Sequence, residues 1–93
     1  MSKPGPGKFE GNASLEVSEA LYEIVGESGQ DEDIGNVGEG GWFGLILNPT
    51  PTEVLTRPAY IVSEDNYGFF WYVEYGSQSK ARSAWKQLLR GYK

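Results

Sequence analysis

The chain has 93 residues, of which 39% are hydrophobic and 14% aromatic, and it contains neither histidine nor cysteine. This length is one domain's worth of chain, and the lack of cysteine excludes disulfides and thiolate-bound zinc. The lack of both residue types excludes Ser-His-Asp and Cys-His catalysis and the commonest general base at neutral pH. We therefore expect a protein that is not an enzyme and that holds no cofactor or metal ion.

Charge is distributed unevenly along the chain, whose net charge is −5. Residues 1–76 contain all 13 acidic residues and only three basic ones, which gives −10. Residues 77–93 contain five basic residues and no acidic one. The negative total argues against general attraction to nucleic acid or to anionic membranes. The sequence thus predicts an acidic body with a basic C-terminal end.

Residues 1–11 combine prolines and glycines with almost nothing to bury, so we expect a disordered arm before a single domain at 12–93. The start of the chain has no apolar stretch that could serve as a signal peptide. The longest nearly apolar run, residues 40–47, is too short to span a bilayer. We expect the protein to remain in the cytoplasm, away from the membrane.

A helix is predicted from about Ser14 to Val25, with Asn12 or Ser14 accepting hydrogen bonds from its first free amides and Gly26 ending it. Its apolar residues recur at helical spacing: Ala13, Val17, Ala20, Leu21, Ile24 and Val25. Acidic residues form a ridge on the opposite side: Glu16, Glu19 and Glu23. A strand is the alternative, because Leu15, Val17 and Tyr22 interrupt the apolar stripe.

Residues 27–41 are rich in glycine and acid and are predicted to be a long connection, with Ile34 and Val37 pinning its middle to the core. An EF-hand loop that starts at Asp31 would require glycine at its sixth position and glutamate at its twelfth, where the chain has Asn36 and Trp42. We therefore interpret the acids at 31–33 as a solvated loop. The glycines at 35, 38, 40 and 41 lack the Lys-Ser or Lys-Thr of a phosphate-binding loop.

Three strands are predicted next, at residues 42–47, 55–62 and 69–75. Pro58 suggests that the second strand lies at an edge or carries a bulge, because proline cannot donate to a β-ladder. Residues 63–68 form a turn between the second and third strands, which makes this pair the clearest hairpin. The order of elements predicts an α+β fold with a three-stranded antiparallel meander between two helices.

The last predicted helix begins at a cap on Ser77 or Ser79 and ends near Tyr92. Its apolar residues share one face at 3.6-residue spacing: Ala81, Ala84, Trp85, Leu88, Leu89 and Tyr92. We expect this helix to pack on the sheet, with both helices mainly on one face. The expected core is Leu21, Ile24, Trp42, Leu45, Leu47, Ile61, Trp71, Val73, Trp85 and Leu88.

The aromatic strand at 69–75 raises the first question of function. Period-two geometry places Phe70 and Tyr72 on one face and Trp71 and Val73 on the other. If the face with Trp71 and Val73 packs on the core, Phe70 and Tyr72 are exposed. They would then stack bases or contact a partner protein, in whose interfaces aromatic residues are enriched. The alternative is that both faces are covered.

Three basic residues on the last helix, Arg82, Lys86 and Arg90, stand four apart along its flank. They are a solvated surface, a docking stripe for an acidic partner, or a set of phosphate contacts. Together with Phe70 and Tyr72 they are the candidate partner-binding residues. The acidic ridge of the first helix mirrors them, so a homodimer is also open.

Four motifs carry a resemblance to a known group of proteins. They are Asp31-Glu-Asp-Ile-Gly35, Gly41-Trp-Phe-Gly44, Ser63-Glu-Asp-Asn-Tyr-Gly-Phe69 and Ser77-x-x-x-Ala81-x-x-Ala84-Trp85. In these the chain resembles small uncharacterised proteins of actinobacterial phages over residues 12–92. In those proteins the last helix opens with several acids, whereas this chain has Gln78-Ser79-Lys80.

The resemblance implies a phage protein that acts in the host cytoplasm, and it carries no functional residues. The leading hypothesis is a non-catalytic accessory protein that binds a host protein, for host takeover or counter-defence. One alternative is nucleic-acid binding through the basic helix and the aromatic strand, against which the negative net charge argues. Another is an acidic mimic of nucleic acid that inhibits a nucleic-acid-binding protein.

Overall fold

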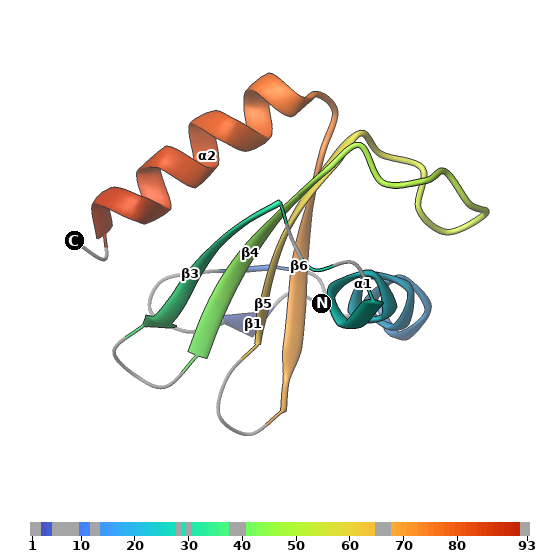
Figure 1. Cartoon of the computed structure of the whole chain (residues 1–93), viewed down its shortest axis with the longest axis horizontal. Coiled ribbons are helices and arrows are strands. Elements are labelled where there is room, and N and C mark those ends of the chain that lie inside the picture. The colour runs from blue at the N-terminus through green and yellow to red at the C-terminus, as the bar shows by residue number, and fades with distance from the viewer. Residues whose placement is uncertain are drawn as a thin grey trace.

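The computed structural model describes residues 3–4, 10–11, 14–27, 29, 31–37, 41–64 and 68–91, with side chains omitted for 3–4, 10–11, 32–37 and 91. Two helices and a four-stranded antiparallel sheet make an α+β fold, as predicted (Figure 1). The elements are β1 (Lys3–Pro4), β2 (Glu10–Gly11), α1 (Leu15–Glu27), β3 (Glu32–Val37), β4 (Gly41–Leu47), β5 (Ala59–Glu64), β6 (Phe70–Tyr75) and α2 (Gln78–Gly91).

The predicted meander is present as β4, β5 and β6, but the sheet has a fourth strand at its edge, in the order β3-β4-β5-β6. The prediction of a long connection at residues 27–41 is therefore wrong over β3. This strand pairs Glu32 with Leu45 and Ile34 with Phe43. Acidic residues and glycine lower strand propensity, but an edge strand tolerates them and is protected by charge from pairing with other chains. The predicted contacts of the Ile34 and Val37 side chains lie outside the described residues.

The second predicted strand begins too early. It starts at Ala59, directly after Pro58, and lies in the interior of the sheet between β4 and β6, not at an edge. The proline precedes the ladder, and its carbonyl accepts the Asn48 N–H at 2.7 Å where the chain leaves β4. The lack of an N–H on Pro58 therefore costs the sheet nothing.

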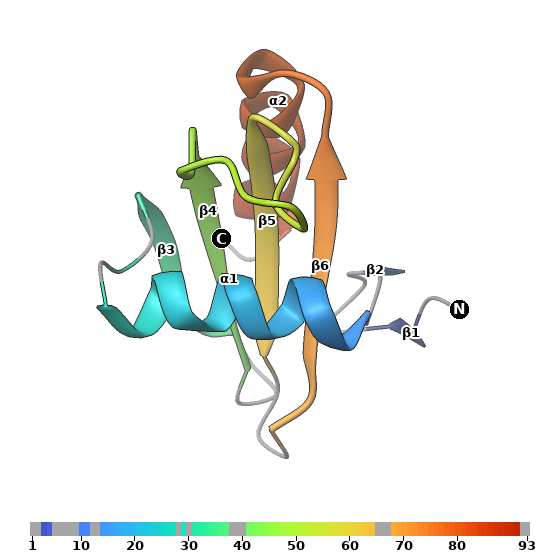
Figure 2. The same ribbon diagram turned by 90° about the vertical axis from the view of Figure 1, so that its right-hand side faces the viewer.

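The two helices lie on opposite faces of the sheet, so the expectation that both pack mainly on one face is wrong. Figure 1 shows α1 and α2 on either side of the strands, and Figure 2 shows α1 crossing the strands with α2 behind them. Strands β4, β5 and β6 each place apolar side chains on both faces, and the alternation divides the described interior into two clusters.

The α2-side cluster contains Phe43, Leu45, Ala59, Ile61, Trp71, Ala81 and Trp85. The α1-side cluster contains Leu21, Ile46, Leu55, Tyr60, Val62 and Tyr72. Of the ten residues predicted for the core, Leu21, Leu45, Ile61, Trp71 and Trp85 are buried, and the others are half-buried against one cluster or the other. The predicted core omits most residues of the α1-side cluster, because it was chosen on the assumption that helices cover only one face of the sheet.

The helix prediction for α1 is confirmed over the strand alternative, and the helix runs two residues past Val25. The Ser14 carbonyl accepts the N–H of Ser18 at 2.9 Å, as expected of a residue that caps the start of a helix. Gly29, not Gly26, ends the helix, because its N–H donates to the Ile24 carbonyl at 3.0 Å and its φ of 77° suits glycine. The alternative cap, Asn12, lies outside the described residues.

Ser77 caps α2, as one of the two predicted alternatives, and its Oγ accepts the N–H of Lys80 at 3.2 Å. Leu88, Leu89 and Ala84 pack against the α2-side cluster, which confirms the amphipathic face. At the other end of the chain, β1 pairs with β2, so the predicted disordered arm is wrong for these four residues. Strand β2 lies against β6 (Figure 2).

Candidate functional site

The three basic residues predicted as a contact stripe lie together on the solvent-facing side of α2. Arg82, Lys86 and Arg90 are all exposed, while Ala81 and Trp85 are buried against the sheet. The other exposed residues of this side are uncharged or basic: Gln78, Ser79, Lys80, Ser83 and Gln87. Because the apolar face of the helix packs against the sheet, its outward side presents only polar groups and positive charge among the described residues.

Tyr72 is not available for contact with a partner, because its side chain is only 4% exposed under α1. Its hydroxyl hydrogen-bonds with Ser14. Burial raises the pKa of Tyr72, and the hydrogen bond with Ser14 opposes this rise. Of the two alternatives for this strand, exposure of Tyr72 is wrong and coverage of both faces is confirmed, because α1 covers the face on which Tyr72 lies.

Phe70 is half-buried and belongs to a row of aromatic side chains at the end of the same face. Its ring centroid lies 5.5 Å from that of Tyr22 on α1 and 6.3 Å from that of Trp42 on β4. The Trp42 Nε1–H donates to Glu64 Oε1 at 3.0 Å, which fixes the indole ring. Tyr22 is 51% exposed, so this row retains accessible aromatic surface. The sequence pointed to Tyr22 only as a break in the apolar stripe of the helix.

The five candidate residues do not form one surface. Arg82, Lys86 and Arg90 lie beyond the α2-side cluster, whereas Phe70 and Tyr72 pack with the α1-side cluster on the opposite face of the sheet. A partner that contacts the basic helix cannot reach Phe70 or Tyr72 across the sheet.

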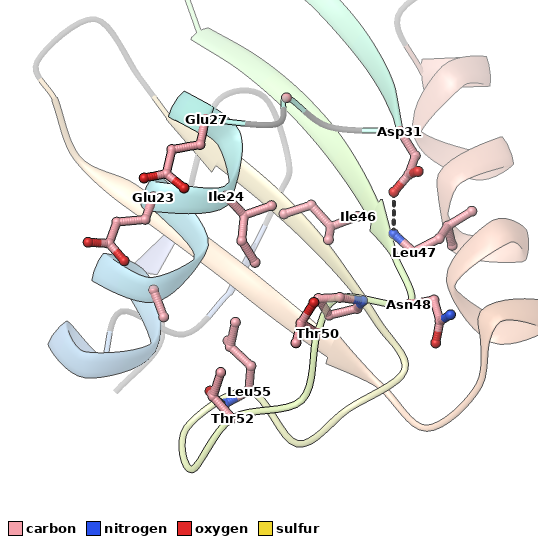
Figure 3. Close-up of a pocket in the computed structure, with 13 residues that line it drawn as sticks. Glu23, Ile24, Glu27, Asp31, Ile46, Leu47, Asn48, Thr50, Thr52 and Leu55 are labelled. Carbon is pink, nitrogen blue, oxygen red and sulfur yellow. Dashed lines mark hydrogen bonds between the residues drawn. The ribbon is translucent and has the colours of Figure 1, made fainter.

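A pocket of 480 Å³ opens between α1 and the loop that joins β4 to β5 (Figure 3). Its volume is within the range of sites for small molecules and single side chains. It is lined by Ala20, Glu23, Ile24, Glu27, Gly29, Asp31, Ile46, Leu47, Asn48, Pro49, Thr50, Thr52 and Leu55. Sequence reasoning missed this pocket, because the helix and the loop that form it are more than 20 residues apart.

The loop wall of the pocket is held by hydrogen bonds of its own. Thr52 Oγ1 accepts the N–H of Leu55 at 2.9 Å, and the Thr52 N–H donates to the Leu55 carbonyl at 3.1 Å. Leu55 is 2% exposed and anchors the loop in the α1-side cluster. The Arg57 N–H donates to the Tyr60 hydroxyl at 3.1 Å, which ties the end of the loop to the sheet. These hydrogen bonds order the loop wall of the pocket without a ligand being needed for them.

Carboxylates mark the rim of the pocket. Glu23 and Glu27 lie one turn apart on α1, and Asp31 lies across the opening, where its Oδ2 accepts the Leu47 N–H at 2.6 Å (Figure 3). No lysine or arginine is among the described residues that line the pocket. The site can therefore hold a cationic group that has an apolar part. Across the described ranges, no group of three or more His, Cys, Asp or Glu side chains is placed to hold a metal ion.

Neither helix in the described part of the chain is long and apolar enough to cross a membrane. Comparison with protein-family models, with curated proteins and with solved structures finds no match for this chain.

Proposed function

We propose that this chain is a non-catalytic protein that binds an acidic surface of a partner protein through the outward side of α2. The observation that carries the proposal is the composition of this side, where Arg82, Lys86 and Arg90 are exposed one turn apart. No acidic residue occurs in residues 77–93 to neutralise them within the helix. Uniform positive charge on an ordered helix suits a partner with a negative patch, because complementary potentials steer association and fix orientation.

The resemblance to small actinobacterial phage proteins supports a bacterial host protein as the partner. A phage product would meet that partner in the host cytoplasm, and it would act by occupying the partner's acidic surface. Host takeover and counter-defence both fit such an action. The absence of histidine and cysteine from the sequence supports binding over catalysis.

Nucleic-acid binding receives less support from the geometry. Of the two aromatic residues expected to stack bases, Tyr72 is buried, and Phe70 lies on the face of the sheet opposite to the basic helix. The net charge of −5 adds general repulsion from phosphate.

The experiment is affinity capture from a nuclease-treated actinobacterial lysate. The wild-type chain is compared with the variant Arg82→Glu, Lys86→Glu, Arg90→Glu, and the bound proteins are identified by mass spectrometry. We expect a host protein that the wild type retains and the variant releases. Circular dichroism establishes that the variant is folded, as expected for three exposed positions. The proposal fails if the folded variant and the wild type capture the same proteins, or if neither captures any.

A further inference from the structure

The pocket between α1 and the β4–β5 loop has an apolar floor beneath a rim of one charge. Its floor consists of aliphatic side chains from α1, β4 and the loop: Ala20, Ile24, Ile46 and Leu55. Figure 3 shows Ile24 and Ile46 pointing toward one another, with Glu23 and Glu27 on the helix and Asp31 beyond. An occupant must therefore have a hydrocarbon part that packs on the floor of the pocket and a positive group that faces the carboxylates at its rim.

The rim carboxylates can pair with a cation without entering the protein interior. Glu23, Glu27 and Asp31 are all exposed, so pairing with a cation does not require these side chains to leave water. The hydrogen bond from the Leu47 N–H holds Asp31 in place at 2.6 Å, so that its carboxylate does not have to be ordered by the occupant.

We propose that this pocket binds an arginine side chain that a basic segment of a partner protein presents. An arginine side chain has a hydrocarbon stem that lies on apolar surface while its guanidinium stays at the water boundary. Its guanidinium has five N–H donors that point in several directions, so it can donate both to the rim carboxylates and to side-chain oxygens of the loop wall at Thr50 and Asn48. A lysine ammonium has three donors and no planar fork, so it uses this wall less well.

A protein segment fits this surface better than a free small cation does. The negative surface continues along α1 beyond the pocket, where Glu16 and Glu19 are exposed. A segment with further basic residues reaches these carboxylates, whereas a single small cation fills only the pocket. This site lies on the α1 side of the sheet, opposite to α2, so it does not depend on the function proposed above.

The direct test is an NMR titration of the ¹⁵N-labelled full chain with a capped pentapeptide that has a central arginine among glycine and serine. The matched probe replaces arginine by citrulline, which has the same shape without the charge. We expect the arginine peptide to shift the amide signals of Ile24, Ile46 and Thr50 and to bind at least about fivefold more tightly than the citrulline peptide.

Two double variants locate the binding. Glu23→Gln with Glu27→Gln removes two carboxylates from the rim, and we expect affinity for the arginine peptide to fall about fivefold. Glu53→Gln with Glu74→Gln removes the same charge from exposed positions that neither line the pocket nor belong to α1, and we expect a change of less than about twofold. The amide spectra of both variants report whether the fold is kept.

Four results would overturn the proposal. Equal affinity for the arginine and citrulline peptides would show that the positive charge does not contribute to recognition. Equal losses in the two double variants would place the binding elsewhere on the acidic surface. Tighter binding of butylguanidinium than of the peptide would make the ligand a free small cation. The signals of the pocket amides could instead shift with protein concentration alone, and Arg82→Glu with Arg90→Glu could abolish these shifts. That result would show that the occupant is a second copy of this chain, and it would contradict the proposal.

Discussion

The hydroxyl of Tyr72 lies within the α1-side cluster and hydrogen-bonds with Ser14, the residue that precedes α1. Burial raises the pKa of Tyr72 because the phenolate is poorly solvated there. Its neutral form is therefore favoured in the folded protein relative to the unfolded chain, where a tyrosine pKa is about 10. The contribution of this residue to stability is complete below about pH 10 and is lost as the pH rises through the folded-state pKa.

Tyr72→Phe should lower the free energy of unfolding by about 1 kcal/mol at pH 7, because it removes a buried hydrogen bond. Above pH 10 the difference between wild type and variant should shrink and then reverse, because only the wild type has this hydroxyl to ionise on unfolding. Urea denaturation of both proteins between pH 7 and 11 measures the difference. A gap that widens with rising pH would contradict the burial of the hydroxyl.

Ser63 presents the opposite situation, a buried polar group without a partner. It is 0% exposed on β5, and within the part of the chain that the structure describes its Oγ has no hydrogen-bond partner. The same holds for Nε1 of Trp71, its cross-strand neighbour. An unmet hydroxyl in an apolar cluster is destabilising, because it loses its hydrogen bonds to water without replacement.

Ser63→Ala should therefore leave the free energy of unfolding unchanged or raise it by up to about 1 kcal/mol. Ser77→Ala is the matched control, because its Oγ accepts the N–H of Lys80 at the start of α2. We expect that variant to lose about 1 kcal/mol. Chemical denaturation checks both values, and a loss at Ser63 as large as that at Ser77 would show that its hydroxyl does have a partner.

At the scale of elements, two glycines near the end of α1 differ in their backbone conformation. Gly26 lies inside the helix, whereas Gly29 has a φ of 77° and closes the helix with its N–H. A Cβ atom would meet nothing within 4 Å at either position. The two sites therefore separate backbone strain from steric contact.

Gly26→Ala should raise the free energy of unfolding by about 0.5–1 kcal/mol, because alanine has the higher helix propensity. Gly29→Ala should lower it by about 1 kcal/mol, because a side chain disfavours positive φ. Thermal or urea unfolding of the two variants tests the difference in sign. Two changes of the same sign would be inconsistent with Gly29 as the terminating residue.

The elements that the sequence predicted best are those with a repeating apolar pattern. Ala81, Trp85 and Leu88 lie on one helical face in the sequence, and the structure buries or half-buries them together. Strand β3 could not be predicted in this way, because its acids and glycines resemble a loop and its order depends on pairing with β4. The alternation of β6 was predicted correctly, but which of its faces would be covered depended on the placement of α1, a long-range contact.

At the scale of the whole molecule, the sheet separates two surfaces of opposite charge. The outward side of α2 carries Arg82, Lys86 and Arg90, and α1 on the other side carries four exposed glutamates, Glu16, Glu19, Glu23 and Glu27. This separation follows from the opposite placement of the helices, which the sequence did not predict, because both helices were expected mainly on one face. The basic residues Arg82, Lys86 and Arg90 could be predicted to share a surface from the sequence of one helix. The pocket could not be predicted, because it forms only where α1 and the β4–β5 loop, two distant segments of the chain, come together.

The placement of the helices also determines what a partner can contact at one time. A partner of α2 covers positive charge alone, and a partner of the pocket covers an apolar floor with negative charge. The two proposed partners would therefore contact opposite faces of the sheet and would not compete for one surface.

The most direct test of the α2 proposal is the affinity of the captured host protein for two single variants, measured by calorimetry. Lys86→Glu reverses a charge at the middle of the basic stripe, and Arg57→Glu makes the same change of net charge at an exposed position in the β4–β5 loop. We predict about tenfold weaker binding for Lys86→Glu, because a like charge then faces the acidic patch, and less than about twofold for Arg57→Glu. Equal effects of the two variants would contradict α2 as the contact surface.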